Sequence, residues 1–109
     1  IFRLPAGFSA RRPEAGAGLA EAGPRLLTIG NRRGLHARAS ARFVTLASQF
    51  DSQLFVAKDG HEVLGISIMG LMMLGAGQGE QISLRAEGPD AEAALDALSR
   101  LVEDGFGED

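Results

Sequence analysis

Four short stretches of the chain carry the apolar pattern of β-strands. In the clearest of them, residues 81–86, the side chains of Ile82, Leu84 and Ala86 share one face, which is the period of a half-buried strand. Alternation or β-type composition predicts strands over residues 25–30, 54–57, 61–64 and 81–86. Asp59 and Gly60 separate the second strand from the third, and their tolerance of positive φ predicts a tight hairpin there.

Residues 37–50 repeat their apolar side chains every three to four positions, which is the period of an amphipathic helix. The polar residues between them fall on the other side of the same helix. A helix over residues 37–50 is therefore predicted. Its expected inner face consists of Phe43, Leu46, Ala47 and Phe50.

Two further helices are predicted later in the chain. Ser67 is a favoured N-cap, because its hydroxyl accepts a hydrogen bond from a free amide, so a short helix is expected from Ser67 to near Gly75. Its expected inner face consists of Ile68, Leu71 and Met72. Gly88-Pro89-Asp90 is expected to open the last helix, with proline near its first turn and acids at its positive end. The apolar stripe of that helix consists of Ala91, Ala94, Leu95, Leu98, Leu101 and Val102.

The predicted element order is β-α-β-β-α-β-α, which places the domain in the α+β class. Hairpins make neighbouring strands antiparallel, so we expect an open-faced β-sandwich in which three helices cover one face of a four-stranded antiparallel sheet. This order is shared with RNA-recognition and small-ligand regulatory domains, and therefore does not identify a function.

Residues 1–24 have a different composition, with four Gly, three Pro and six Ala and no sustained apolar period. Such a segment buries too little apolar surface to offset its chain entropy. We expect a flexible or loosely docked extension over residues 1–24, without a function of its own, and a folded domain over residues 25–109.

Composition excludes several kinds of chemistry. The 109 residues include no Cys, which removes disulfides, thiolate metal sites and a cysteine nucleophile. No apolar run is long enough to cross a membrane and no secretory signal is present, so a cytoplasmic location is expected. A net charge of −3 argues against a general nucleic-acid binder.

This average charge conceals an uneven distribution. The body of the domain has five arginines before its first acid, and seven acids against one arginine after residue 89. The early arginines are Arg25, Arg32, Arg33, Arg38 and Arg42. The distribution predicts a cationic anion-binding site near the start of the first helix and an acidic last helix.

His36 lies within the cationic segment, directly before the first predicted helix. The free amides of Ala37, Arg38 and Ala39 at that helix start attract anions, and Arg38 adds a bidentate donor for phosphate oxygens. This positive surrounding disfavours a protonated imidazole, so His36 is expected to be neutral and nucleophilic near pH 7. The alternative is an ordinary solvated or capping histidine. His61 is interpreted as a surface residue, and neither a metal nor a cofactor is expected.

Two sequence motifs resemble those of a known family. Gly34-Leu-His-Ala-Arg-Ala-Ser40 is similar to the active-site signature of HPr, the histidine phosphocarrier of the bacterial phosphoenolpyruvate-dependent phosphotransferase system. Ser67-Ile-Met-Gly-Leu-Met-Met-Leu74 is similar to the second signature of that family, and Ser67 follows His36 by 31 positions, as the family pattern requires. The resemblance extends from residue 25 to about residue 105.

The resemblance implies a role for each matching residue. His36 would take phosphate on Nδ1 from phosphorylated enzyme I and pass it to an enzyme IIA protein, with Arg38 assisting. Ser67 would match the serine that an HPr serine kinase modifies in many members. The partner-docking surface would include Ile68, Met69, Met72 and Met73. We expect a monomeric carrier that is not a stand-alone catalyst, with no nucleic-acid or membrane partner.

Two departures from the family pattern, and two alternative functions, bear on this interpretation. Ala39 stands where members usually have Pro, and Ile66 stands where Lys, Asn or Thr is frequent. The methionine-rich motif favours the nitrogen-related branch over sugar uptake. A nucleic-acid or small-ligand binding module is the main alternative, although Phe55 is the only aromatic residue available for base stacking on its strands. A hydrolase that uses His36 as a base lacks a nearby nucleophile or carboxylate in the sequence.

Overall fold

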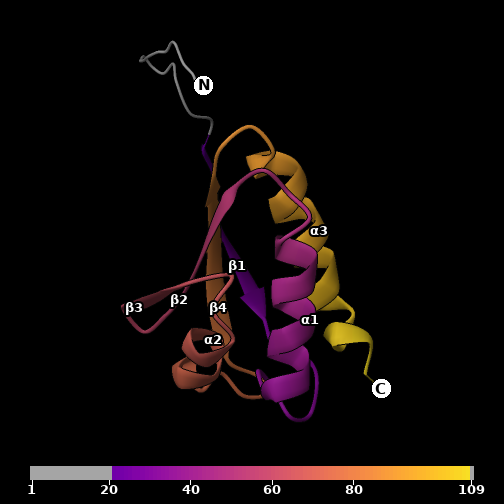
Figure 1. The fold of residues 1–109 in the computed structure, drawn as a ribbon. Helices are drawn as coiled ribbons and strands as arrows, with labels where there is room; N and C mark the ends of the chain where they lie inside the picture. The colour runs from indigo at the N-terminus through magenta and orange to yellow at the C-terminus, as the bar shows by residue number, and fades with distance from the viewer. Residues whose placement is uncertain (1–20, 109) are drawn as a thin grey trace.

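Residues 21–108, which the computed structural model of the chain describes, contain the predicted elements in the predicted order (Figure 1). The strands are β1 (Glu21–Thr28), β2 (Gln53–Lys58), β3 (His61–Leu64) and β4 (Gln81–Glu87), and the helices are α1 (Ala37–Ala47), α2 (Ile68–Leu74) and α3 (Ala91–Glu103), followed by a 3₁₀ turn, η1 (Gly105–Gly107). Within the described part of the chain, every helix is too short or too polar to cross a membrane.

The four strands form one antiparallel sheet with the order β1-β4-β2-β3. Asp59 and Gly60 form the β2–β3 hairpin with positive φ values of 52° and 84°, as the sequence predicts. Helices α1 and α3 lie against one face of the sheet, while α2 lies at its lower end in Figure 1. The expected α+β open-faced sandwich is therefore confirmed.

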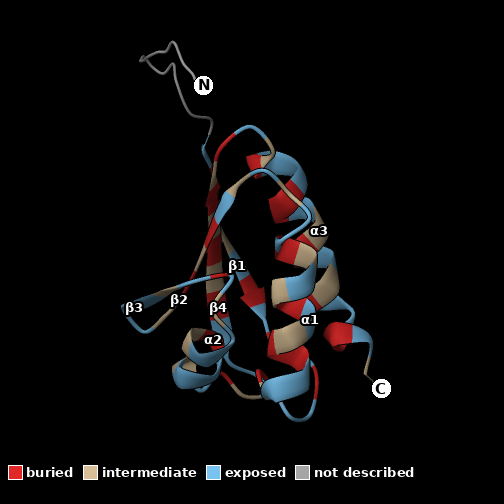
Figure 2. Cartoon of the chain, viewed as in Figure 1, coloured by how far each residue is buried: buried red, intermediate tan, exposed pale blue. Residues whose placement is uncertain are grey.

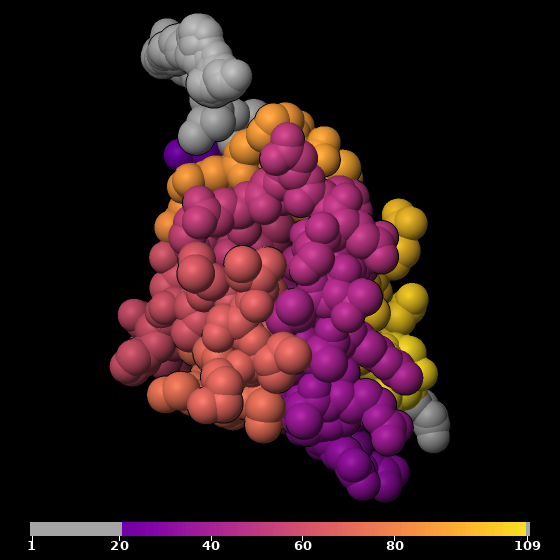
Figure 3. Space-filling model, in the orientation of Figure 1, coloured from indigo at the N-terminus to yellow at the C-terminus, as the bar shows by residue number. Residues whose placement is uncertain are grey.

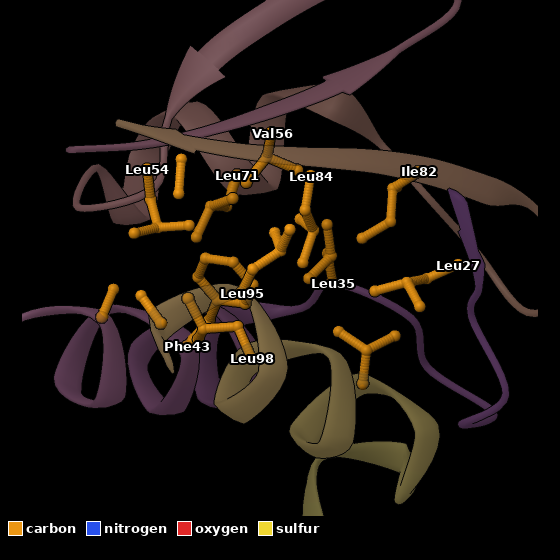
Figure 4. Close-up of a cluster of buried hydrophobic side chains, with 14 of the residues drawn as sticks. Leu27, Leu35, Phe43, Leu54, Val56, Leu71, Ile82, Leu84, Leu95 and Leu98 are labelled. Atoms are coloured by element: carbon orange, nitrogen blue, oxygen red, sulfur yellow. The ribbon is translucent and has the colours of Figure 1, made fainter. Parts of the chain in front are cut away.

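The core lies between the sheet and the helices. Buried positions concentrate on the sides of these layers that face each other (Figure 2). Phe43 of α1, Leu84 of β4 and Leu98 of α3 are fully buried there, and Figure 4 shows these side chains pointing toward one another. Leu71 is the residue that α2 contributes to the same cluster. A single apolar core thus fixes the positions of all three helices.

The other face of the sheet is open. Leu26 on β1 is 66 % exposed, because its neighbour Leu27 points into the core. On the same open face, the Arg85 guanidinium lies 3.9 Å from the centre of the Phe55 ring. Arg85 is held there by ion pairs with Glu62 and Glu87, at 2.9 and 2.8 Å.

The ends of several elements differ from the predicted ones. Strand β1 begins at Glu21, so residues 21–24 belong to the sheet and not to the extension. The pairing shifts register between Ala22 and Arg25. The Gly-Pro pair in this segment interrupts the alternation that would have indicated the first part of the strand. Residues 1–20 of the expected extension lie outside the described residues. Helix α1 ends at Ala47 instead of residue 50. Helix α3 starts at Ala91, so its proline lies before the helix.

The predicted inner face of α2 is wrong at two of three positions. Leu71 is buried, but Ile68 and Met72 are 40 % and 42 % exposed. A helix of only seven residues that lies at one end of the sheet presents a single ridge to the core. Leu74 packs partly buried against the core, and the side chains left on the surface are Ile68, Met69, Met72 and Met73.

Candidate functional site

His36 is the N-cap residue of α1, as its position in the sequence indicates. Its backbone is extended, with φ −78° and ψ −177°, and its carbonyl accepts the first helical hydrogen bond, from the Ser40 amide at 2.9 Å. The ring Nδ1 accepts from the Arg38 amide at 3.3 Å. This nitrogen consequently faces the free amides of the first turn, where a helix attracts anions.

The loop before α1 is fixed by a close backbone contact. Gly34 has a φ of +65°, and a Cβ atom at this position would lie 2.2 Å from the Ala76 carbonyl oxygen. The next residue, Leu35, donates its amide to the same carbonyl at 3.0 Å. Only glycine permits this approach. The glycine of the first motif thus fastens the loop that carries His36 to the segment between α2 and β4.

The second ring nitrogen of His36 meets a carboxylate from the other end of the chain. Nε2 lies 2.6 Å from Oε2 of Glu108, and both side chains are about one-fifth exposed. The other carboxylate oxygen accepts from Nδ2 of the buried Asn31 at 3.0 Å. The Asn31 amide is the main reason why the pKa of Glu108 lies below its ordinary range, and the His36 ring and the Arg42 guanidinium lower it further.

A cationic groove adjoins this pair. It is lined by Arg32, Arg33, Arg38, Arg42, Gly107 and Glu108. All four arginines are exposed, and Arg42 also donates to the carbonyl of Phe106. Figure 3 shows the C-terminal segment, in yellow, beside the purple N-terminal part of α1. The groove is suited to bind an anionic group next to the His36 ring.

Arg25, the fifth arginine of the cationic segment, lies elsewhere. Its guanidinium pairs with Asp96 at 3.0 Å and donates to Ser99 at 3.1 Å, both on α3. The expected cluster of five arginines around His36 is therefore wrong for Arg25. The last acids are also not confined to α3, since Glu108 lies at the cationic site.

The residues of the second motif lie on α2, which packs against α1. Ser67 is the N-cap of α2, and its Oγ accepts from the Gly70 amide at 2.9 Å, as predicted. The four candidate docking residues, Ile68, Met69, Met72 and Met73, are all exposed. Leu64 and Ile66, which come shortly before Ser67, are also exposed, and we call these six residues together the α2 patch.

His61, the other histidine, is exposed at the start of β3. Within residues 21–108, no three side chains of the His, Cys, Asp or Glu type come together in the way that a metal site requires.

The sequence did not indicate three features of the site. These are the roles of Asn31 and Glu108, and the hydrogen bond from Arg42 to the C-terminal segment. Glu108 follows His36 by 72 positions and Asn31 by 77. No local period or motif connects residues so far apart. The excess of acids after residue 89 was the only available signal, and it does not indicate which acid reaches the histidine.

Comparison with known proteins assigns the family. The family model described as "PTS HPr component phosphorylation site" matches residues 25–104. The phosphocarrier protein HPr of Cupriavidus necator is 49 % identical over 81 residues, which cover 74 % of this chain and 91 % of the relative. The phosphocarrier protein NPr of Shewanella violacea is 43 % identical over 84 residues, covering 77 % and 92 %.

Solved structures agree with this match. HPr from Thermoanaerobacter tengcongensis aligns with a TM-score of 0.75 and 48 % identity over 83 % of this chain and 98 % of that one. A structure described as an HPr dimer from the same organism aligns with a TM-score of 0.64 and 51 % identity, over 75 % and 94 %. Both motifs, the fold and these relatives agree that the chain belongs to the HPr family of phosphocarriers of the phosphotransferase system.

Proposed function

We propose that this chain accepts a phosphoryl group on Nδ1 of His36 from phosphorylated enzyme I and passes it to an enzyme IIA protein. One observation carries the proposal: His36 caps α1 with Nδ1 directed at the free amides, while the groove beside the ring is lined by arginines. A nucleophile and a site for its anionic product thus occupy the same place.

The chemistry follows from this arrangement. The lone pair of Nδ1 forms a bond to phosphorus while the bond between phosphorus and the donor breaks, and that electron pair leaves with the donor. The phosphoryl oxygens then lie near the amides of Ala37, Arg38 and Ala39 and the Arg38 guanidinium. Because these contacts are exposed to solvent, each amide of the helix start stabilises the product only modestly, by about 0.3–1 kcal/mol. Modest stabilisation suits a carrier that must also release the group.

The direct test is phosphorylation in solution. The protein is incubated with phosphoenolpyruvate and enzyme I of the same organism, and acid-labile phosphate is followed by mass spectrometry and phosphorus NMR. We expect one phosphate on the wild type and on His61→Ala, and none on His36→Ala. An unlabelled wild type, or a labelled His36→Ala, would contradict the proposal.

The α2 patch is proposed as the surface that docks these partners. It is apolar, exposed and contiguous with α1, which carries His36, and flexible methionines adapt to more than one partner. Met73 is 80 % exposed, so Met73→Glu is expected to weaken enzyme I binding about tenfold. Leu26→Glu is the matched control, since Leu26 is an exposed apolar residue on the open face of the sheet. Equal affinities of the two variants for enzyme I would show that the α2 patch is not part of the interface.

Modification of Ser67 by an HPr serine kinase is proposed as a regulatory step. Its support is the match of the second motif and the position of Ser67 at the start of α2, beside the proposed docking surface. A phosphate there would place a dianion next to the α2 patch and weaken docking more than it changes the fold. Ser67→Asp should bind enzyme I less tightly than the wild type, and unchanged affinity would count against this step.

The alternative of a nucleic-acid or ligand-binding module has less support. Phe55 lies under the Arg85 guanidinium, which two glutamates hold in place, so its ring does not offer a free stacking surface. The nitrogen-related role, the cytoplasmic location and the monomeric state stay predictions. Relatives named HPr and NPr both match most of the chain, so the enzyme IIA protein that accepts the phosphate is what would distinguish the branches.

A further inference from the structure

Glu108 contacts the ring nitrogen of His36 that faces away from the helix amides. We propose that Glu108 is a positioning residue, which keeps the proton on Nε2 and stabilises the positive charge that the ring acquires when Nδ1 bonds phosphorus. This inference rests on the proposed function, because Glu108 acts only through His36.

The carboxylate is placed by contacts of the segment that carries it. Phe106 is fully buried and anchors η1 in the core. Arg42 of α1 donates to the Phe106 carbonyl. The buried side chain of Asn31 donates to both the Gly34 carbonyl, at 2.9 Å, and the Glu108 carboxylate, at 3.0 Å. Glu108 is therefore connected to the same loop that positions His36, and its contact with the ring does not depend on one ion pair.

These contacts determine which nitrogen of His36 carries a proton. An ionised carboxylate only accepts hydrogen bonds, so the 2.6 Å contact with Glu108 requires a hydrogen on Nε2. In a neutral imidazole the other nitrogen is then an acceptor, and Nδ1 does accept from the Arg38 amide. Both contacts thus select the form of the ring whose Nδ1 lone pair is available for attack.

The retained proton matters in both directions of transfer. When Nδ1 bonds phosphorus, Nε2 keeps its hydrogen and the ring becomes cationic, next to the Glu108 carboxylate. When the group is passed on, the bond between Nδ1 and phosphorus breaks and its electron pair returns to Nδ1. The leaving group is then a neutral imidazole, because Nε2 still holds its proton. Without that proton the ring would have to leave as an anion, which is far less favourable.

The charges around the pair explain why a carboxylate is needed. Arg38 and Arg42 of α1 and Arg32 and Arg33 of the preceding loop line the groove and make it cationic. Glu108 is the acidic residue among the side chains that line this groove. The arginines therefore favour the phosphoryl group on the Nδ1 side, while Glu108 favours the protonated ring on the Nε2 side.

The first test observes the proton itself, in the unphosphorylated protein. In a ¹⁵N-labelled sample, we expect the Nε2 hydrogen of His36 to give a resolved downfield signal, because the carboxylate slows its exchange with water. Glu108→Ala should remove this signal and Glu108→Gln should shift it upfield. Glu103→Gln removes the same charge from the exposed end of α3 and should leave it unchanged, with the ring of His61 as an internal reference.

The second test follows the phosphorylated protein over pH by phosphorus NMR. The phosphorus shift reports the pH at which phosphohistidine loses its Nε2 proton. We expect this midpoint to lie about one pH unit lower in Glu108→Gln than in the wild type and Glu103→Gln, because a neighbouring negative charge is lost. Above this midpoint, transfer to enzyme IIA should be about tenfold slower in Glu108→Gln.

The outcomes separate this inference from the proposed function. If the wild type takes phosphate on His36 but Glu108→Gln and Glu103→Gln have the same midpoint, the role of Glu108 is overturned and the carrier stands. If the wild type takes no phosphate, the carrier fails, and the Nε2 hydrogen signal still shows whether Glu108 holds the proton. A signal that survives in Glu108→Ala overturns the inference in either case.

Discussion

Two helices of this protein begin with a side chain that accepts a hydrogen bond from the first turn, and the two caps behave differently. Ser67 caps α2 by accepting from the Gly70 amide at 2.9 Å, in apolar surroundings. His36 caps α1 by accepting from the Arg38 amide at 3.3 Å, in cationic surroundings. The serine cap is short, whereas the imidazole cap is long and weak.

The same local role, capping a helix with a side chain, thus serves two purposes. A strong cap stabilises its helix, and the Ser67 hydroxyl does so through the Gly70 amide. A weak cap leaves the Nδ1 lone pair accessible, and Glu108 occupies the other ring nitrogen from across the fold. The reactive cap is the one that the C-terminal segment contacts.

The loops that hold the two helices differ in how much space surrounds their glycines. Gly34, before α1, and Gly75, after α2, both have a φ of +65°, but a Cβ would meet the Ala76 carbonyl at 2.2 Å only at Gly34. Gly34→Ala should lower the free energy of unfolding by about 3 kcal/mol, and Gly75→Ala by about 1 kcal/mol. Urea unfolding followed by circular dichroism measures both. Equal losses would show that the contact with Ala76 does not constrain the His36 loop.

Removal of the guanidinium at the reactive cap should affect transfer and not stability. Arg38→Ala is expected to slow phosphoryl transfer from enzyme I about a hundredfold, as the loss of one donor to a developing charge does elsewhere. Arg25→Ala removes the same charge from a site that pairs with α3 and should transfer at nearly the wild-type rate. Rapid-quench kinetics compare the variants. Similar rates for both would show that the helix amides suffice at His36.

The unmodified Ser67 cap should contribute to stability and not to phosphate uptake by His36. Ser67→Ala is expected to lower the free energy of unfolding by about 1 kcal/mol, because the Gly70 amide loses its acceptor. Ser67→Asp keeps an acceptor and should lose much less. Thermal unfolding of the two variants, at neutral pH, provides the measurement. A change in the rate at which Ser67→Ala takes up phosphate would contradict the proposal that the two caps have separate roles.

The smallest expected effect is the pH dependence that Glu108 gives to stability. Its pKa in the folded protein lies below the ordinary value of 4.5, so its contacts are fully formed above about pH 4.5 and weaken as pH falls through the depressed value. Glu108→Gln should be less stable than the wild type at pH 7, and the two should converge in acid. Glu103→Gln corrects for the change in net charge. A stability difference that does not shrink in acid would show that the carboxylate is not ionised in its contacts.

The sequence was sufficient for elements whose cause is local. The alternation in β4, the Asp59-Gly60 turn and the Ser67 cap are each determined by residues within a few positions, and all are confirmed. The start of β1 was displaced because the register shift in this strand is a tertiary effect. The exposure of Ile68 and Met72 likewise depends on where α2 lies on the sheet. The helical period of the sequence does not determine that position.

The residues of the candidate site likewise fall into those that local sequence predicts and those that only the fold brings together. His36 and Arg38 lie two positions apart in one motif, so their placement at the start of α1 could be predicted. Glu108 could not, because its contact with His36 arises from the path of η1 after α3 and from the burial of Phe106. Charge counting along the chain assigned Glu108 to a separate acidic region, although the fold brings it to the cationic one.

The central claim is that Nδ1 of His36 is the reactive atom while Nε2 keeps its proton toward Glu108. Phosphorylation of the ¹⁵N-labelled protein by phosphoenolpyruvate and enzyme I, followed by measurement of the one-bond coupling between phosphorus and nitrogen, tests it most directly. The account predicts a coupling to Nδ1 of His36, with a hydrogen still attached to Nε2. A coupling to Nε2 of His36, or to either ring nitrogen of His61, would contradict it.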